Sequence, residues 1–214
     1  MSYQIKTTTT MKTINKEITL YSVSDLKNHP IVLKNVLDKQ YNINVYEDFW
    51  YEGIIDDHTQ KLESLGFNEV KIAFSGFGSQ GDGASFTCKS IDFKKWLSEN
   101  STNNNKRLLS LLNKDLIEID GYIKRDRNTH YCHWNTTTLY LSSDVFGERD
   151  SYPNIESTIE QLDEDITNFM QSYNKKIYTE LDKLYFDLIS EKTILETLEA
   201  NDYEFTADGN IYTG

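Results

Sequence analysis

The sequence predicts an α+β fold: an antiparallel four-stranded sheet with helices packed on one face, followed by a long C-terminal helical arm. Two stretches, 69–89 and 117–141, alternate apolar and polar residues with the period of a β-strand. Beyond Pro153, apolar residues recur at steps of three and four as far as Leu188, which is the period of a helix. Strand pairs followed by a helical stretch are typical of an α+β protein.

The first 66 residues predict a flexible leader, a short strand and two helices. Residues 1–15 are rich in threonine and form the leader, and the weak alternation over 18–23 favours a short strand. Pro30 suits the first turn of a helix, where its missing N–H costs nothing. A second helix is expected over 47–65, and Gly66 supplies the left-handed residue that commonly follows a helix end.

The two predicted hairpins are separated by short helices. Residues 69–89 form a hairpin with a long glycine-rich connection, and helices are expected over 92–100 and around 108–112. The second hairpin pairs a strand over 117–123 with a return strand over 129–141. Together these four strands would make the sheet.

The C-terminal third is predicted to be helical. The stripe from Ile155 to Leu188 is either one long helix or two helices broken near Ser172–Asn174. Ser190 would cap a short helix over 191–200, and residues 207–210 would turn a small terminal hairpin. The sequence thus predicts three regions, which are a leader (1–15), an α+β core domain (16–150) and an acidic helical region (151–214).

The charge of the chain is concentrated at its C-terminal end. The net charge is −12, and residues 151–214 hold 14 acidic and 4 basic side chains. Direct nucleic-acid binding is therefore not expected, because phosphate binding relies on lysine and arginine. A partner with a basic surface would be attracted. The alternative is that these acids form only the solvated face of a long helix.

Composition also bears on the compartment. The chain has two cysteines, Cys88 and Cys132, and no zinc-binding pattern, which favours a reducing compartment. No segment approaches the roughly 20 apolar residues that a membrane span needs. We expect a cytoplasmic protein without cofactor or metal, which the helical arm could join into a homo-oligomer.

The glycine-rich connection is the main candidate for a ligand or partner site. Four of the ten glycines fall within residues 76–83, and such density permits close backbone approach and an anion-binding nest of N–H groups. It is neither a P-loop nor a Rossmann fingerprint. The alternative is a hairpin loop whose side chains bond its own backbone. The candidate residues are Ser75, Gly76, Ser79, Gln80, Gly81, Asp82, Gly83, Ser85, His130 and His133.

His130 and His133 do not predict a metal site. On a strand, positions three apart point to opposite faces, so the pair could chelate one ion only if the segment turned. A hydrolase built from Ser79 or Ser85 with His130 and Asp82 is a weaker alternative, because the sequence has no nucleophile elbow. His58 lies on an apolar helix stripe and is expected in the core.

Four segments resemble a known family. FSGFGSQGDGASF (74–86), DFWYEGIIDDHTQKLESLGF (48–67), THYCHW (129–134) and ETLEANDYEFTADGNIY (196–212) are similar to stretches of an uncharacterised family of phage and bacterial accessory proteins, some labelled antitoxin-like. The chain departs from the family at Trp134 and Asn135, where an acidic residue is expected, so no His/carboxylate site is carried over. The resemblance implies a mobile-element setting and no particular reaction.

Two functions from different classes follow. The leading one is an accessory protein that binds a host protein stoichiometrically in the cytoplasm and inhibits a defence or regulatory function, through acids at 156, 160, 163, 164 and 165. The alternative is a small-ligand site, for a nucleotide-like molecule, built from residues 75–85 and the strand that carries His130.

Overall fold

The chain folds into two compact units. The computed structural model describes residues 17–126, 129–146 and 152–213, so the predicted leader lies outside the described residues. Unit 1 combines Met1–Asn44 with Ile189–Gly214, and unit 2 is Val45–Leu188. Each unit has its own cluster of buried apolar side chains.

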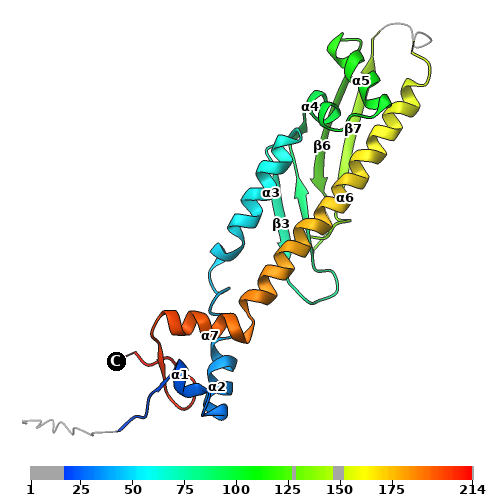
Figure 1. The fold of residues 1–214 in the computed structure, drawn as a ribbon. Coiled ribbons are helices and arrows are strands. Elements are labelled where there is room, and N and C mark those ends of the chain that lie inside the picture. Colours follow the sequence, from blue (N-terminus) through cyan, green and yellow to red (C-terminus); the bar gives the residue numbers. More distant parts are fainter. Residues whose placement is uncertain (1–16, 127–128, 147–151, 214) are drawn as a thin grey trace, which may run out of the picture. The chain divides into compact units, whose positions relative to one another are not determined.

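Unit 2 is a mixed helix and strand structure, which confirms the α+β class (Figure 1). It contains three antiparallel strand pairs and four α-helices among the described residues. In chain order the elements are the 3-10 helix η1 (Asp48–Tyr51), α3 (Glu52–Ser64), β2 (Phe67–Asn68), β3 (Lys71–Ser75), β4 (Gly83–Thr87), β5 (Ser90–Ile91), α4 (Phe93–Glu99), α5 (Asn103–Asn113), β6 (Ile117–Arg125), β7 (Thr137–Val145) and α6 (Ile155–Leu188).

The prediction of one four-stranded sheet is wrong, because β3–β4 and β6–β7 form separate two-stranded ribbons. They meet at a single bridge, where Cys88 and Ile123 exchange backbone hydrogen bonds of 3.1 and 3.2 Å. Two residues earlier on the same edge, the N–H of Phe86 donates to Oδ1 of Asn174, at 2.9 Å, instead of to a strand. A side chain of α6 therefore stops the ladder that would have joined the ribbons.

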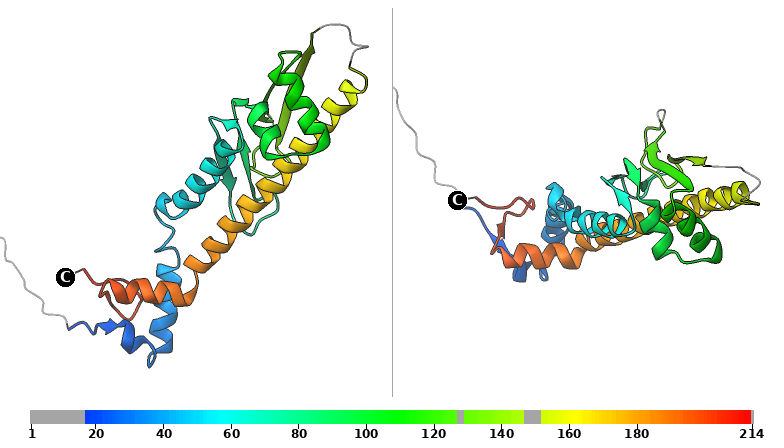
Figure 2. Two further views of the ribbon diagram at one scale, coloured as in Figure 1. Left: turned by 45° about the horizontal axis from the view of Figure 1, so that its top comes forward. Right: turned by 90° about the horizontal axis from the view of Figure 1, so that it is seen from above.

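The predicted helical arm is one continuous helix of 34 residues, with no break near Ser172. It is not free of the core, because Leu162, Ile166 and Leu181 are buried in the same cluster as the strands. α3 lies along α6 (Figure 2) and contacts β3, whereas α6 contacts both β4 and β7. Within the described residues, no helix has the length and apolar character needed to cross a membrane.

The second hairpin is shifted from its predicted position. The return strand was expected over 129–141, whereas β7 begins at Thr137 and runs to Val145. The segment before it turns back on itself, since the N–H of Thr136 donates to the carbonyl of His133 at 3.0 Å. Residues 129–136 are therefore a loop, which places His130 and His133 outside the strand.

Unit 1 is assembled from segments far apart in the sequence. β1 pairs antiparallel with β8, so that Tyr21 lies opposite Phe205, and the helices bury Val36, Ile194 and Leu198 in one cluster. The elements are β1 (Tyr21–Ser22), α1 (Val23–Leu26), α2 (Pro30–Gln40), α7 (Glu191–Ala200) and β8 (Glu204–Phe205).

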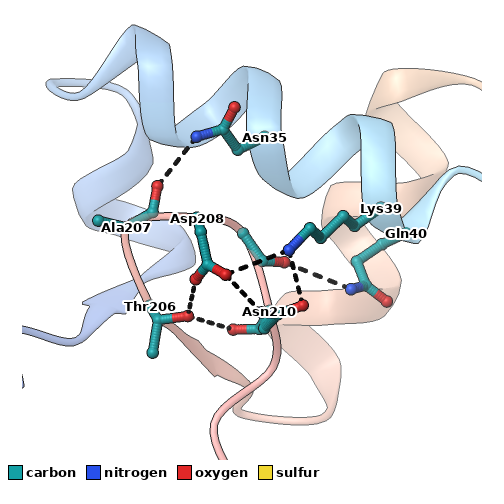
Figure 3. Close-up of polar contacts among 8 residues, drawn as sticks. Asn35, Lys39, Gln40, Thr206, Ala207, Asp208 and Asn210 are labelled. Carbon is teal, nitrogen blue, oxygen red and sulfur yellow. Dashed lines mark hydrogen bonds and ion pairs between the residues drawn. The ribbon is translucent and has the colours of Figure 1, made fainter.

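The turn after β8 is held tightly against α2 (Figure 3). Asn35 Nδ2 donates to the carbonyl of Ala207 at 3.0 Å, and Lys39 Nζ donates to Asn210 Oδ1 at 2.8 Å and lies 3.3 Å from Asp208 Oδ2. A Cβ atom at Gly209 would lie 2.4 Å from the backbone of Asn35, so only glycine fits there. This turn connects the C-terminal segment of unit 1 to its N-terminal segment.

Several local predictions are confirmed. Pro30 is the first residue of α2, and Gly66 follows α3 with a φ of 101°. Ser190 caps α7, because its hydroxyl accepts a hydrogen bond from the N–H of Thr193. Each of these residues acts through its own backbone geometry or through a hydrogen bond to a residue a few positions away, so each can be recognised without the rest of the fold.

Candidate functional site

The glycine-rich loop connects β3 to β4 and is organised by its own aspartate. Asp82 Oδ2 accepts a hydrogen bond of 2.6 Å from the N–H of Ser79, and the Asp82 N–H donates to the Ser79 carbonyl at 3.2 Å. The carboxylate also lies over Gly76, where a Cβ atom would come within 2.8 Å of Asp82 Oδ1. The positive φ of Gly76 and of Gly81 explains why glycine stands at these positions.

The loop and the segment before β7 are in direct contact. Ser75 Oγ lies 3.2 Å from both the carbonyl and the N–H of Cys132, donating to the first and accepting from the second. A Cβ atom at Gly83 would lie 2.9 Å from Cys132 O and from His133 Cα, and one at Gly81 would lie 3.3 Å from the ring of Tyr131. The structure thus brings together the two segments that the sequence analysis grouped.

Aromatic rings hold the other side of the loop against α6. The ring of Phe77 stacks on Tyr185 and Tyr178, with centroids 4.5 and 5.8 Å apart. Burial, together with the nearby carboxylates of Asp182 and Asp82, raises the pKa of Tyr178. These contacts fix the loop between α6 and residues 131–133.

The predicted site residues differ in how accessible they are. Ser79, Gln80 and His130 are exposed, whereas Gly83 and Ser85 are buried within β4. Nδ1 of His133 lies 2.6 Å from the amide oxygen of Asn135. Among the described residues, no three His, Cys, Asp or Glu side chains are placed to share a metal ion.

The loop offers fewer free donors than its glycine content suggests. An anion-binding nest needs backbone N–H groups that point at the ligand, and the N–H of Ser79 already donates to the carboxylate of Asp82. An incoming phosphate would have to displace that carboxylate and would be repelled by it. The exposed side chains of Ser79 and Gln80 remain accessible to a ligand.

His58 forms a buried polar contact between α3 and α6. Its side chain is in the core, as predicted, with Nδ1 3.1 Å from the Tyr173 hydroxyl and Nε2 3.1 Å from Glu180 Oε2. Burial and the nearby Glu180 raise the pKa of Tyr173. Both ring nitrogens are satisfied, so this group stabilises the packing of two helices.

A second candidate site is an acidic groove between β7 and α6. Its volume is about 570 Å³, and its apolar part is formed by Leu141 and Ile159. Glu160, Asp163 and Glu164 share one face of α6 because they are three and four residues apart. We call this surface the acidic groove; it is lined by Leu141, Ser143, Ile159, Glu160, Asp163, Glu164 and Thr167.

The acids of the groove have no cationic partner within the described part of the chain. None of the ion pairs that the described residues form involves Glu160, Asp163 or Glu164. Asp165, which the sequence analysis placed with them, lines a different hollow together with Trp96 and other residues. The sequence could identify the acids, but the groove depends on β7 lying beside α6, for which it carries no signal.

The comparisons with known proteins identify a family. The family model described as "Domain of unknown function (DUF8835)" matches residues 50–191, which is 142 of the 214 residues. The chain belongs to this family. No curated protein and no solved structure matches the chain.

The family match covers most of unit 2. The glycine-rich loop, the segment before β7 and the acidic groove all lie within residues 50–191. Most of unit 1 lies outside this range. Both candidate sites are therefore features of the DUF8835 region of this chain.

Proposed function

We propose that this protein acts by stoichiometric binding, and that its acidic groove captures a basic segment of a partner protein. What supports the proposal is a set of three carboxylates on one side of the groove, without a cationic partner among the described residues, next to an apolar floor. Uncompensated carboxylates attract cationic groups, and the net charge of −12 strengthens this attraction at a distance.

The biological setting of the proposal comes from the resemblance alone. In a phage or mobile-element setting the partner is a host protein, and its capture in the cytoplasm inhibits a defence or regulatory function. Such a protein needs no catalytic residues, because one molecule occupies one partner.

The test compares two sets of charge-neutralising substitutions. The groove variant combines Glu160→Gln, Asp163→Asn and Glu164→Gln. The control variant makes the same change in net charge on the exposed face of α3, with Asp56→Asn, Asp57→Asn and Glu63→Gln. Each is used as bait in host lysate beside the unmodified protein, and the captured proteins are quantified by mass spectrometry.

The proposal predicts that one specific partner is lost by the groove variant and retained by the α3 variant. Capture should also weaken as salt is raised, because the Debye length falls from about 10 Å at 0.1 M to about 3 Å at 1 M. Equal loss in both variants would mean that only the overall charge matters. Equal capture by all three baits would refute the groove as the binding surface.

The alternative function, a nucleotide-like ligand held by the loop, draws support from one observation. Ser75 and Gly83 contact Cys132 and His133, so the two candidate segments form one surface. A thermal-shift screen with nucleotides, cyclic nucleotides and dinucleotides tests this function. A stabilisation that disappears on Gln80→Ala would support it, and the absence of any stabilisation would refute it.

A further inference from the structure

The outer edge of β7 presents backbone groups that no strand among the described residues uses. The β6–β7 ladder is flanked by two hydrogen bonds of 3.0 Å between directly opposite residues, from the N–H of Asp126 to Thr136 O and from the N–H of Phe146 to Leu116 O. In an antiparallel pair, such hydrogen-bonded positions alternate with positions whose N–H and C=O point away from the partner. Leu141 and Ser143 therefore direct their backbone groups away from β6.

The other edge of β6 confirms this alternation. Ile123 belongs to the positions that face away from β7, and it exchanges hydrogen bonds with Cys88 on that side. On β7, in contrast, the described residues provide no hydrogen-bond partner for the backbone of Leu141 or Ser143. An unpaired strand edge is a template for pairing with another chain.

The unpaired edge lies next to the acidic groove. Leu141 and Ser143 line the groove together with residues of α6, which runs beside β7 in Figure 1. The helical side of the groove extends from Ile159 to Thr167, which is about 12 Å at the helical rise of 1.5 Å per residue. At about 3.4 Å per residue, this length corresponds to roughly four residues of extended chain.

The spacing of the acids matches the spacing of side chains on an added strand. Glu160 and Glu164 are four residues apart, or about 6 Å along the helix axis. Alternate residues of a strand point to the same side and are about 6.8 Å apart. Two basic side chains at alternate positions could therefore each face one glutamate, and Asp163 lies between these two.

The residue between the two basic ones would point to the opposite face of the ribbon. There Tyr122 and Tyr140 lie directly opposite each other and stack, with ring centroids 4.9 Å apart, although both rings remain exposed. An apolar side chain on the added strand would pack beside Tyr140 as a cross-strand neighbour. The preferred segment thus alternates basic and apolar residues.

We infer that the outer edge of β7 binds an extended basic segment of the partner by β-strand addition, with lysine or arginine at alternate positions facing Glu160 and Glu164. This inference rests on the proposed capture of a basic partner and specifies how that partner is held. Backbone hydrogen bonds then supply affinity, and the acidic helix supplies selectivity. A second copy of this chain is a poor occupant, because it would bring two sets of acids together.

The test uses the full chain and defined peptides. One peptide with capped ends alternates lysine and valine. A second, the block peptide, has the same composition but carries its lysines and its valines in two separate runs. Two further peptides repeat the alternating sequence with N-methyl groups on either the lysines or the valines, which removes one set of backbone donors and keeps the charge. Binding is measured by calorimetry, and amide exchange is followed by NMR.

Strand addition predicts that the alternating peptide binds and that the block peptide binds more weakly. One of the two N-methylated peptides should lose roughly tenfold to hundredfold in affinity, as expected for one or two lost hydrogen bonds. The amides of Leu141 and Ser143 should exchange more slowly in the complex. Those of Ser142 and Asp144, already bonded to β6, should not change.

Two substitutions in β7 provide a matched pair. Ser143→Pro removes an outward N–H and leaves the β6 ladder intact, since proline is tolerated on an edge strand at such a position. Ser143→Pro should lower the affinity for the alternating peptide to the same extent as N-methylation, whereas the Ser142→Ala variant should bind this peptide with unchanged affinity. If Ser143→Pro fails to fold, the N-methylated peptides still decide the question.

The outcomes separate the two proposals. If all the lysine peptides bind equally and only the groove variant Glu160→Gln, Asp163→Asn, Glu164→Gln abolishes binding, charge capture stands and strand addition is refuted. If no peptide binds, both are refuted. Light scattering and amide exchange of the free protein provide a further check. If the free protein is a dimer and the amides of Leu141 and Ser143 are protected in it, a second copy occupies the edge and the inference is wrong.

Discussion

Replacing Asn174 with alanine should destabilise unit 2 by about 2–3 kcal/mol. The side chain is fully buried, and its Oδ1 is the acceptor for the N–H of Phe86 at 2.9 Å. Without it, this buried N–H loses its partner, which costs about 1–3 kcal/mol, and the lost packing of the side chain adds to that. For a domain of this size, the change corresponds to a fall in Tm of roughly 4–12 °C.

A control substitution separates the two hydrogen bonds of Asn174. Nδ2 donates to Thr137 Oγ1 over a longer distance, 3.4 Å. Thr137→Val removes that bond and leaves the N–H of Phe86 satisfied, but it leaves the buried Nδ2 of Asn174 without this acceptor, so it should also cost about 1–3 kcal/mol. The two variants are therefore separated by the Phe86 amide, which should lose its protection from exchange only in Asn174→Ala.

The assay is urea unfolding followed by amide exchange at Phe86. Asn174→Ala should lower the midpoint without changing the denaturant slope, and the Phe86 amide should lose protection. If the free energies of unfolding of Asn174→Ala and of the unmodified protein differ by less than about 0.5 kcal/mol, and the Phe86 amide stays protected, Asn174 is not what separates the two ribbons.

Three further predictions concern other parts of the molecule. Burial raises the pKa of the Cys88 thiol to about 11, so iodoacetamide at pH 8 should alkylate it only after unfolding, as read by mass spectrometry. Hydrogen bonds from Thr206 and a nearby lysine hold the pKa of Asp208 below its usual value. The stabilisation that these contacts contribute is therefore fully present above the pKa of Asp208 in the unfolded chain, and it is lost as the pH falls through the lower pKa of the folded protein. Thr206→Val should raise the pKa of Asp208 in an NMR titration; an unchanged value would show that the hydroxyl has no effect. Gly209→Ala should abolish amide protection in β1 and β8, whereas Gly78→Ala, which has a similar φ and open space around it, should cost only about 1–2 kcal/mol; equal costs would refute the steric explanation.

The features that the sequence predicted correctly depend on local chemistry. Pro30, Gly66 and Ser190 mark helix ends through fixed φ, positive φ and a side-chain cap, and each effect operates within a few residues. The long helix was predicted in position because its apolar stripe persists over 34 residues. The sequence could not decide whether this helix is broken near Ser172, because polar residues within an apolar stripe can either end a helix or be buried with a hydrogen-bond partner.

The errors arose where a distant side chain competes with a regular pattern. Strand periodicity predicts which residues can pair, but not that Asn174 takes the N–H of Phe86. The start of β7 was misplaced because Ser75 holds the backbone of Cys132 in a loop, a contact across 57 residues. For the same reason the acids on α6 were recognisable from the sequence, while the strand edge beside them was not.

The pairing of β1 with β8 sets an order of events during synthesis. About 180 residues separate the two strands, so at roughly 5–20 residues per second the ribosome needs about 10–40 seconds to deliver the second after the first. During that interval Leu26, Val32 and Val36 have none of their C-terminal partners and remain exposed on the nascent chain. The cluster of unit 1 therefore cannot be completed until the C-terminal segment has been synthesised, and a slower ribosome would prolong the delay.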